Sequence, residues 1–269
     1  MFLHQISNTV GDTIVNAYLY DGWSWVQHMH KAFEFSFVLD GSIEATAGDR
    51  QYTLGAGDGL LALPFQLHAL RIPAGARVLV VVFSASHVPA FAACTDGKMA
   101  DNAFVRLSDA AAQYFVASFF GRTVPASLPP EQYLAVPIPH PLRLKACLYA
   151  VCAEFAESAH FSPRTGDTEL TRRILDYIET NYRENISLKT MATTLGYAYH
   201  YLSRVFGETF GMHFNTLLNQ YRCDRADALI AQGAGTLAEI AMESGFQSIR
   251  TFNRVYRSIC GRAPSRRGG

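Results

Sequence analysis

The sequence predicts a multidomain α+β chain, with an antiparallel β jelly-roll barrel and a helical segment ahead of an all-α domain that carries two helix-turn-helix motifs. Two observations predict this division. Short β-type runs separated by glycine-rich turns occupy residues 1–90, and helical periodicity dominates the remainder. A third observation is an internal repeat within residues 186–259, in which each copy reads as helix, glycine turn and second helix.

The composition is that of a globular protein. Hydrophobic residues make up 49% of the 269 residues and charged residues 17%, which excludes a disordered chain. There is no run of about 18 apolar residues, and residues 1–10 lack a basic segment followed by an apolar run. We therefore expect no membrane span and no secretory signal. The five scattered cysteines form no CxxC pair, which indicates reduced thiols in the cytoplasm.

The charges are unevenly distributed. The formal net charge is zero, which would argue against a nucleic-acid partner if the charges were evenly spread. Residues 1–165 contain 10 basic and 13 acidic residues, whereas residues 166–269 contain 13 basic and 10 acidic ones, and 12 of these 13 are arginine. The arginine fork matches phosphates and guanine edges. A run of charged residues more often forms a solvent-exposed face than a binding surface, so the pattern of the neighbouring residues has to distinguish the two.

The first ninety residues have the pattern of short strands and turns. Asp40-Gly41-Ser42 separates two β-type runs and predicts a hairpin. Glycine-containing turns follow at residues 48–50 and 55–59, and the β-branched run at residues 77–83 indicates a buried strand. Strands at this spacing are typical of a sandwich or barrel, including the jelly roll.

A helical and loop segment follows the strands. Residues 108–120 and 142–157 have apolar residues at helical spacing, with a proline-bearing stretch between them. Residues 162–166, Ser-Pro-Arg-Thr-Gly, are the best linker candidate. We therefore divide the chain into a β domain (1–90), a helical and loop segment (91–161), a linker (162–168) and a helical domain (169–269).

The repeat in the helical domain has helix-turn-helix form. Residues 186–210 and 236–259 each contain a short helix that begins at a Ser or Thr cap, then a turn and a second helix. In the turns, Gly196-Tyr197 and Gly245-Phe246, glycine permits a positive φ and the aromatic residue fills the small core. One such match is a weak signal, but two in tandem indicate a DNA-binding domain.

The second helix of each copy is expected to lie in the major groove, with its first outward residues over base edges. These outward residues are His200, Ser203 and Arg204 in the first copy and Arg250, Thr251, Asn253 and Arg254 in the second. Arginine can pair with guanine and asparagine with adenine. The pattern favours base contacts for Arg250 and Thr251, whereas phosphate contacts or packing explain Arg204 and Arg254 equally well.

The segment between the two copies is long enough to separate their second helices by about one turn of DNA. Residues 213–231 are expected to form one helix, which at ~1.5 Å per residue is about 28 Å long. This length is close to the ~34 Å of one DNA turn, so a single chain can place two helices in successive major grooves.

Several short segments of the two copies, of the helix between them and of the residues that follow carry a family resemblance: Leu202-Ser203-Arg204-Val205-Phe206, Gly211, Tyr221-Arg222, Ile240-Ala241, Gly245-Phe246, Phe252-Asn253-Arg254, Tyr256-Arg257 and Gly261-Arg262-Ala263-Pro264-Ser265. Through them residues 169–265 resemble the AraC/XylS-type transcription regulators. The chain departs from that pattern at Cys260, where a large apolar residue is usual, and at residues 266–269, where an aromatic residue and a further helical turn are usual.

The resemblance implies a bacterial-type regulator with a cupin-like effector domain. Its partners would be promoter DNA, a small-molecule effector and RNA polymerase, and it would act as an activator. Residues 91–161 would mediate homodimerisation. From the residues alone, packing of helix 142–157 against its own domain is about as good an explanation.

The N-terminal domain contains a histidine and carboxylate motif. The first cupin motif is matched residue for residue, Gly22-x5-His28-x-His30-x3-Glu34-x6-Gly41, and the second in part, Gly59-x4-Pro64-x3-His68. The two histidines of the first motif are two apart on a strand and point to one face, where the glutamate and the third histidine can converge on a divalent metal. The alternative is a metal-free effector pocket, as the family resemblance implies.

The effector pocket is expected around the same residues. Its predicted lining is Trp23, Trp25, His28, His30, Glu34 and His68, with further aromatic walls from Phe33, Phe35, Phe37 and Phe65. Apolar walls with a few polar groups are usual in ligand sites. The alternative for the aromatic residues is ordinary core packing.

The expected function is that of a cytoplasmic, effector-responsive transcription regulator without enzymatic activity. One alternative is a metal-dependent cupin enzyme fused to a DNA-binding domain, for which the four candidate ligands would form the active centre. Another is a constitutive DNA-binding protein whose β domain is purely structural.

Overall fold

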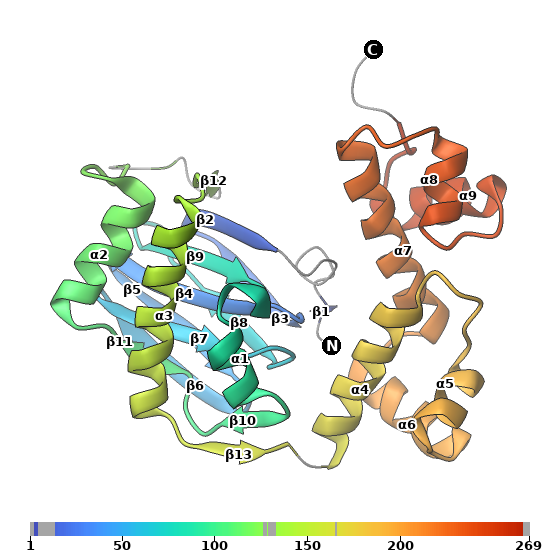
Figure 1. The fold of residues 1–269 in the computed structure, drawn as a ribbon, viewed down its shortest axis with the longest axis horizontal. Coiled ribbons are helices and arrows are strands. Elements are labelled where there is room, and N and C mark those ends of the chain that lie inside the picture. Colours follow the sequence, from blue (N-terminus) through green and yellow to red (C-terminus); the bar gives the residue numbers. More distant parts are fainter. Residues whose placement is uncertain (1–2, 5–13, 126–127, 129–132, 165, 266–269) are drawn as a thin grey trace. The chain divides into compact units, whose positions relative to one another are not determined.

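The computed structural model describes residues 3–4, 14–125, 128, 133–164 and 166–265. The chain divides into two compact units, one of residues 2–164 and one of residues 165–269. The first is β-rich with helices, and the second is helical (Figure 1), which confirms the predicted fold class. Within the described part of the chain, no helix is both long and apolar enough to span a bilayer.

Two sheets form the N-terminal unit. The strands of the larger sheet are β2 (Val15–Asp21), β4 (Phe33–Asp40), β7 (Asp58–Ala62), β9 (Arg77–Phe83), β11 (Phe104–Arg106) and β12 (Tyr133–Ala135), in the order β11-β7-β4-β9-β2-β12. Those of the smaller sheet are β1 (Leu3–His4), β3 (Ser24–Met29), β5 (Ser42–Ala47), β6 (Arg50–Gly55) and β8 (His68–Arg71), in the order β1-β3-β8-β5-β6. The β1–β3 pair is parallel, and the other pairs in these sheets are antiparallel.

The two sheets enclose one hydrophobic core. Side chains alternate along a strand, so every second residue of β4 and β9 faces the smaller sheet. Val38 and Val80 contribute from the larger sheet, and Ile43 and Leu70 from the smaller one; all four are buried in the same cluster. This core is the interior into which the candidate ligands of the N-terminal unit project.

Helices cover the other face of the larger sheet (Figure 1). They are the short 3-10 helix η2 (Ala85–His87) and the α-helices α1 (Pro89–Thr95), α2 (Asp109–Phe120) and α3 (Pro141–Ser158). Phe115 of α2 and Phe155 of α3 share a second buried cluster with Phe35 and Leu79 of the sheet. The helical segment 91–161 is therefore part of the same compact unit as the strands.

A two-stranded sheet ends the N-terminal unit. β10 (Lys98–Ala100) pairs antiparallel with β13 (Phe161–Pro163), and the backbone N–H of Arg164 donates to the carbonyl of Gly97 at 2.8 Å. The segment that we expected to be a linker, 162–168, thus contains part of β13 and the first residues of the next helix. Strand pairing with a segment more than sixty residues earlier orders the turn-rich sequence.

The C-terminal unit consists of helices, and two of them begin at a capping box. They are α4 (Gly166–Asn181), α5 (Leu188–Leu195), α6 (Tyr199–Phe210), α7 (Phe214–Ala231), α8 (Leu237–Glu243) and α9 (Ile249–Cys260). Thr236 caps α8 and forms a capping box with Glu239, and Ser187 forms another with Thr190 at α5.

Both predicted interhelical turns contain a glycine with positive φ. Gly196 follows α5 with φ 76°, and Gly245 follows α8 with φ 89°. At Gly245 an added Cβ would lie 2.7 Å from the Cα of Arg183, so this glycine is required both for its conformation and for the close approach. The two helix-turn-helix motifs, α5–α6 and α8–α9, therefore form as the sequence predicts.

Candidate functional site

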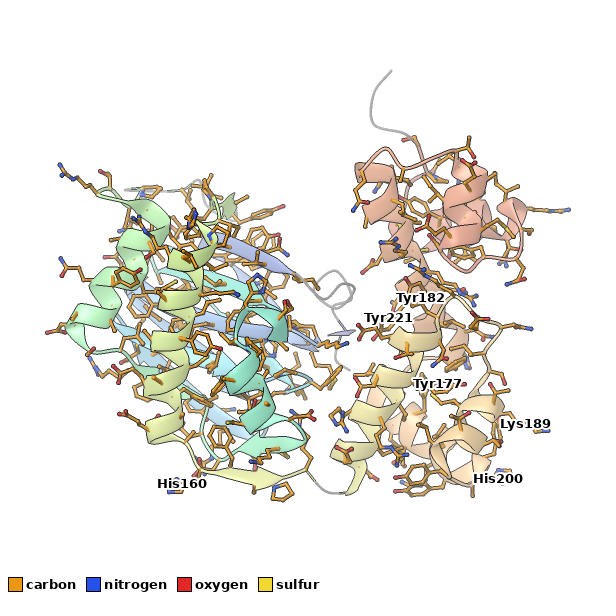
Figure 2. All side chains as sticks on the ribbon, viewed as in Figure 1. His160, Tyr177, Tyr182, Lys189, His200 and Tyr221 are labelled. Carbon is orange, nitrogen blue, oxygen red and sulfur yellow. The ribbon has the colours of Figure 1, made fainter. Side chains whose placement is uncertain are left out.

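The outward face of α6 carries the first set of predicted DNA-contacting residues. His200 and Arg204 are exposed and Ser203 is half-buried, and Figure 2 shows His200 at the surface of the helical unit. The guanidinium of Arg204 donates to Oε2 of Glu208 at 2.6 Å and lies 5.4 Å from the ring centroid of Tyr201. Arg204 is thus held along its own helix by a carboxylate one turn away.

The outward face of α9 carries the second set. Arg250, Thr251, Asn253 and Arg254 are all exposed, while Phe252, Val255 and Tyr256 on the opposite face are buried. The backbone N–H of Thr251 donates to Oγ of the capping residue Ser248 at 3.2 Å, and the Ser248 hydroxyl donates to Oγ1 of Thr251 at 3.0 Å. The hydroxyl of Thr251 therefore helps to begin the helix, which leaves its methyl group for an apolar contact.

The arginines of α9 differ from other arginines of this unit in their partners. Arg225 pairs with Glu243 at 2.7 Å and Arg262 with Asp227 at 2.8 Å. Among the described residues, no acidic side chain pairs with Arg250, Arg254 or Arg257. An exposed helix face with uncompensated positive charge is what a phosphate or guanine contact requires.

Two apolar residues on these helices are absent from the sequence prediction. Tyr199 is 47% exposed and Ile249 is 44% exposed, and each is the first residue of its helix, α6 and α9. They occupy matching positions of the repeat, fifty residues apart, and this correspondence is the signal that would have identified them. At the start of a groove-binding helix, an apolar side chain can contact a thymine methyl group.

The four candidate metal ligands of the N-terminal unit come together. His28 lies on β3, Glu34 on β4 and His68 on β8, and His30 lies just after the end of β3. One ligand atom from each lies within 4.8 Å of all the others, and the four residues are only 1–4% exposed. His30 is outside the strand on which we expected it, and the chain between β3 and β4 still directs it to the cluster.

A β-bulge and two backbone carbonyls orient the histidines. The pairing of β3 with β8 shifts between Trp25 and His28, which places His28 directly opposite His68 on one face of the sheet. Nδ1 of His30 donates to the carbonyl of Ala32 at 2.9 Å, and Nδ1 of His68 donates to the carbonyl of Gln66 at 2.8 Å. With Nδ1 as the donor, Nε2 of each ring faces the cluster.

Glu34 lies between these two imidazoles. Its Oε2 is 3.2 Å from Nε2 of His30, its Oε1 is 3.6 Å from Nε2 of His68, and the Ser36 hydroxyl donates to Oε1 at 3.4 Å. Burial by itself raises the pKa of Glu34, but the nearby charge of His68 and the close contacts with both histidines outweigh burial and hold the pKa well below its usual value. The carboxylate is therefore ionised inside the core.

The cluster fits a divalent transition metal. Three imidazoles and one carboxylate are the donor set that zinc, nickel, cobalt, iron and manganese sites use. Among the described residues, Nε2 of His68 has no partner within hydrogen-bond distance, and it lies 3.6 Å from Oε1 of Glu34. The hydrogen bonds from Nδ1 to backbone carbonyls are those by which proteins orient metal-binding histidines.

An aromatic group adjoins the cluster on one side. The ring centroids of Trp25 and His28 are 5.8 Å apart, those of Tyr20 and Trp25 are 5.7 Å apart, and those of Tyr20 and Tyr133 are 5.8 Å apart. Trp23 joins the same group at 5.7 Å from Trp25. Trp25 thus lies beside the cluster and Trp23 beside Trp25. The tyrosines were missed, although Tyr20 has a signal in the alternation of β2; Tyr133 follows the proline-bearing stretch and has none.

The phenylalanines proposed as pocket walls lie elsewhere. Phe33, Phe35 and Phe37 belong to the core between the larger sheet and the helices. They alternate along β4 with Glu34 and therefore project from the opposite face. Phe65 remains near the cluster, since its backbone N–H donates to the carbonyl of His30 at 2.8 Å.

A separate hollow of about 470 Å³ lies along β3, β5, β6 and β8. Its lining combines Trp25 with outward-facing residues such as Glu44 and Arg71, which form an exposed ion pair at 3.1 Å. None of the four clustered ligands lines it.

Two family profiles match the chain. The one described as "AraC-like ligand binding domain" matches residues 13–171, and the one described as "Helix-turn-helix domain" matches residues 191–267. Together they cover both units.

Relatives and solved structures agree with these matches. An uncharacterised HTH-type transcriptional regulator of Staphylococcus aureus (strain MRSA252) is 27% identical over 117 residues, which are 41% of this chain and 16% of that protein. The virulence regulon transcriptional activator VirF of Yersinia enterocolitica is 29% identical over 93 residues, 35% of this chain and 34% of that one. This chain thus aligns with about a sixth of the length of the first relative.

The fold resembles that of ToxT from Vibrio cholerae. The 1.65 Å structure superposes with a TM-score of 0.51 at 14% identity over 94% of this chain and 96% of ToxT. The structure of wild-type ToxT bound to an unsaturated fatty acid gives 0.53 at 16% identity over 94% of this chain and 93% of ToxT. At sequence identities of 14% and 16%, the similarity is evidence for a shared fold alone.

Proposed function

Because the chain belongs to the AraC family of helix-turn-helix regulators, we propose that it is a sequence-specific DNA-binding transcription regulator whose N-terminal unit binds an effector. The observation that carries the proposal is the exposed face of α9, where Arg250, Arg254 and Arg257 have no acidic partner among the described residues. That face lies on the second helix of a motif whose second helix reads the major groove.

The two recognition helices are proposed to engage DNA together. The helix between the motifs, α7, has 18 residues and is therefore about 27 Å long. This length supports the insertion of α6 and α9 into successive major grooves about 34 Å apart. We propose that His200, Ser203 and Arg204 of α6 and Arg250, Thr251, Asn253 and Arg254 of α9 contact the DNA, with phosphate contacts more prominent for Arg204 because Glu208 already binds it.

We propose further that the chain forms a homodimer through α3. Leu142, Ala146, Tyr149, Ala153 and Ala156 are exposed and follow the four-three spacing of a coiled-coil seam. Leu142 is 73% exposed, which is unusual for a large apolar side chain at the start of a helix that otherwise packs on a sheet.

The charges of α3 favour an antiparallel dimer. Its N-terminal half carries the exposed Arg143 and Lys145, and its C-terminal half carries Glu154 and Glu157. The helix dipole disfavours this distribution within a single helix. When two copies run antiparallel, the basic half of one helix lies beside the acidic half of the other, and the same charges become attractive.

The regulator is proposed to act in the cytoplasm as an activator that contacts RNA polymerase. The name of the VirF relative, a transcriptional activator, supports activation. Both relatives are named as regulators, which supports a function without catalysis. A metal-dependent cupin enzyme carried on a DNA-binding domain is the second candidate, and the observation that favours it is the buried cluster of three histidines and a glutamate.

Selection from random DNA tests the proposed function. The full chain is used to enrich binding sequences from a random library. The expected result is one enriched site that contains two short conserved blocks about 10 base pairs apart, one for each recognition helix. Failure to enrich any sequence above the starting library would overturn the proposal.

A further inference from the structure

We infer that the first residues of the two recognition helices, Tyr199 of α6 and Ile249 of α9, recognise thymine in the bound DNA through its 5-methyl group. The inference rests on the proposed function, because it concerns the DNA site that the two helices bind together. It assigns one thymine to each half of that site, and it adds two apolar contacts to the polar contacts already proposed.

The two helices carry the same arrangement of side chains around these residues. The order in α6 is Tyr199, His200, Ser203 and Arg204, and fifty residues later the order in α9 is Ile249, Arg250, Asn253 and Arg254. Residues four apart are neighbours on a helix surface, so Ile249 lies beside the exposed Asn253. The ring of Tyr199 meets that of His200 edge-on, with the centroids 5.6 Å apart. Each apolar side chain therefore adjoins residues that are proposed to contact DNA.

The other apolar side chains of these helices have partners inside the protein. Leu202, Val205, Phe206 and Phe210 of α6 and Phe252, Val255 and Tyr256 of α9 are buried. Tyr201 is 37% exposed, but its hydroxyl donates to Oδ1 of Asp167 at 3.0 Å and its ring stacks on that of Tyr197. Of the described residues of α9, Phe252 belongs to the core cluster of the second motif and Ile249 lies outside it. The core of the motif therefore does not explain an isoleucine at this position.

The chemistry of the major groove determines what an apolar side chain can contact there. Base pairs present ring nitrogens, carbonyl oxygens and amino groups to this groove, and the 5-methyl group of thymine is the apolar group among them. An isoleucine side chain or a tyrosine ring against a polar base edge would displace water without forming a hydrogen bond in return. Against a methyl group, the same side chain buries apolar surface on both partners. Thymine is therefore the base that these residues favour.

The position of the two residues is also that of a base contact. In helix-turn-helix proteins, the N-terminal residues of the second helix meet the base edges. α6 begins at Tyr199 and α9 begins at Ile249. Next to Ile249, the exposed Arg250 has no acidic partner among the described residues and is available to DNA. The contacts of the arginine with DNA would carry the isoleucine into the groove.

The first experiment removes the methyl group from the DNA. In the site obtained by selection from random DNA, each thymine of the two blocks is replaced in turn by deoxyuridine, which keeps the hydrogen-bonding groups of thymine and lacks its methyl group. The dissociation constant of the full chain should rise about fourfold at one position in each block, which is the factor for losing the burial of one group of this size. Blocks without a conserved thymine, or equal binding of thymine and deoxyuridine at every position, would overturn the inference.

The second experiment links each methyl group to one side chain. Ile249→Ala should lose the difference between thymine and deoxyuridine in one block, and Ile249→Val, which keeps a branched side chain, should retain most of it. Tyr199→Ala should lose the difference in the other block, and Tyr199→Phe, which keeps the ring, should retain it. Full discrimination in both alanine variants would show that other side chains contact the methyl groups.

A matched control comes from the first helix of the second motif. Met242 on α8 is 57% exposed, so Met242→Ala removes an exposed apolar side chain from the same motif but outside its recognition helix. Both differences between thymine and deoxyuridine should stay unchanged in this variant. Each difference is a ratio of two dissociation constants for one protein, so it does not depend on the fraction of that protein that is folded. A loss of both differences in Met242→Ala would contradict the assignment to Tyr199 and Ile249.

The third experiment restores a methyl group on a different base. Cytosine in place of the recognised thymine should weaken binding, and 5-methylcytosine, whose methyl group occupies the same place in the groove, should bind about fourfold more tightly than cytosine. Ile249→Ala should bind both cytosines equally at the position assigned to Ile249. If a site is selected but no methyl group affects binding, the inference is wrong and the proposed function stands. If no sequence is selected, the proposed function fails and the inference fails with it.

Discussion

Oε1 of Glu34 and Nε2 of His68 lie 3.6 Å apart inside the N-terminal unit, one on β4 of the larger sheet and the other on β8 of the smaller sheet. This buried pair is the direct polar link between the two sheets at the centre of the candidate site. The family profiles place ligand binding in the N-terminal unit and the helix-turn-helix motifs in the C-terminal unit. The two functions can therefore be tested by separate substitutions.

Arg250→Ala is predicted to weaken specific DNA binding. A bidentate contact between arginine and guanine contributes about 1–3 kcal/mol of discrimination against other bases. The dissociation constant for the selected site should therefore rise by the factor that corresponds to this energy, and the preference for guanine at one base pair should weaken. Binding to random DNA should change little. The control is Arg122→Ala, which removes an exposed arginine from the N-terminal unit. Equal losses on selected and random DNA would show that Arg250 contacts phosphate only.

Reversing a charge on α3 is predicted to weaken the dimer, and a second reversal to restore it. Arg143→Glu places an acidic residue in the basic half of the helix, so an antiparallel pair would gain like-charge contacts and its dissociation constant should rise about tenfold at low salt. Glu157→Arg should act in the same way, and the double variant should recover wild-type assembly. Analytical sedimentation measures the dimer dissociation constants of the wild type, the two single variants and the double variant. A double variant whose dimer is weakened by the sum of the two single effects would contradict the antiparallel arrangement.

The stability of the C-terminal unit is predicted to depend on the protonation of Asp224 on α7. Burial, followed by the neighbouring charge of Asp227, raises the pKa of Asp224 to about 7. In the unfolded chain the pKa of aspartate is about 4, so between about pH 4 and pH 7 the folded state binds more protons and its stability falls as the pH rises.

Asp224→Asn should remove this pH dependence. At pH 8 we expect the variant to be more stable than the wild type by about 1–3 kcal/mol, and at pH 4 nearly equal to it. Calorimetry of the full chain at both pH values measures the transition of the helical unit, with Asp96→Asn in the exposed turn after α1 as the control. A variant that is less stable at pH 8 would contradict the predicted sign.

Two glycines of the helical unit are predicted to respond in opposite ways to alanine. Gly245→Ala should destabilise the unit by about 2–4 kcal/mol, because φ is +89° and the new Cβ would lie 2.7 Å from backbone atoms of Tyr182 and Arg183. Gly207→Ala, in the interior of α6 with open space around it, should be neutral or stabilise by up to about 1 kcal/mol. Denaturation of both variants checks the pair, and similar losses would show that the turn at Gly245 tolerates a side chain.

The parts of the structure that the sequence predicted are those with a local signature. The helix-turn-helix motifs follow from caps, turn glycines and a repeat of fifty residues, all of which act within a few turns of chain. The four clustered ligands were predicted from a motif that fixes their spacing. His30 nevertheless lies beyond the end of β3, because the strand stops at Met29 and the connection to β4 directs the ring inward.

The errors arise where distant segments decide the outcome. Both faces of β4 are covered, because all residues from Phe33 to Val38 are buried. The sequence of the strand therefore does not show which face meets the other sheet and which meets the helices. Phe33, Phe35 and Phe37, predicted as pocket walls with core packing as the alternative, lie in the core between the larger sheet and the helices. The turn-rich segment at residues 162–163 became a strand through pairing with Lys98–Ala100, and Tyr133 joined the aromatic group through the pairing of β12 with β2.

The most direct test of the central claim is the ratio of dissociation constants for the selected DNA site and for random DNA, measured with the full chain at one salt concentration. A sequence-specific regulator should bind its site at least about a thousandfold more tightly than random DNA. A ratio below about tenfold would contradict the account, because the exposed arginines of α9 would then provide only sequence-independent attraction to phosphates.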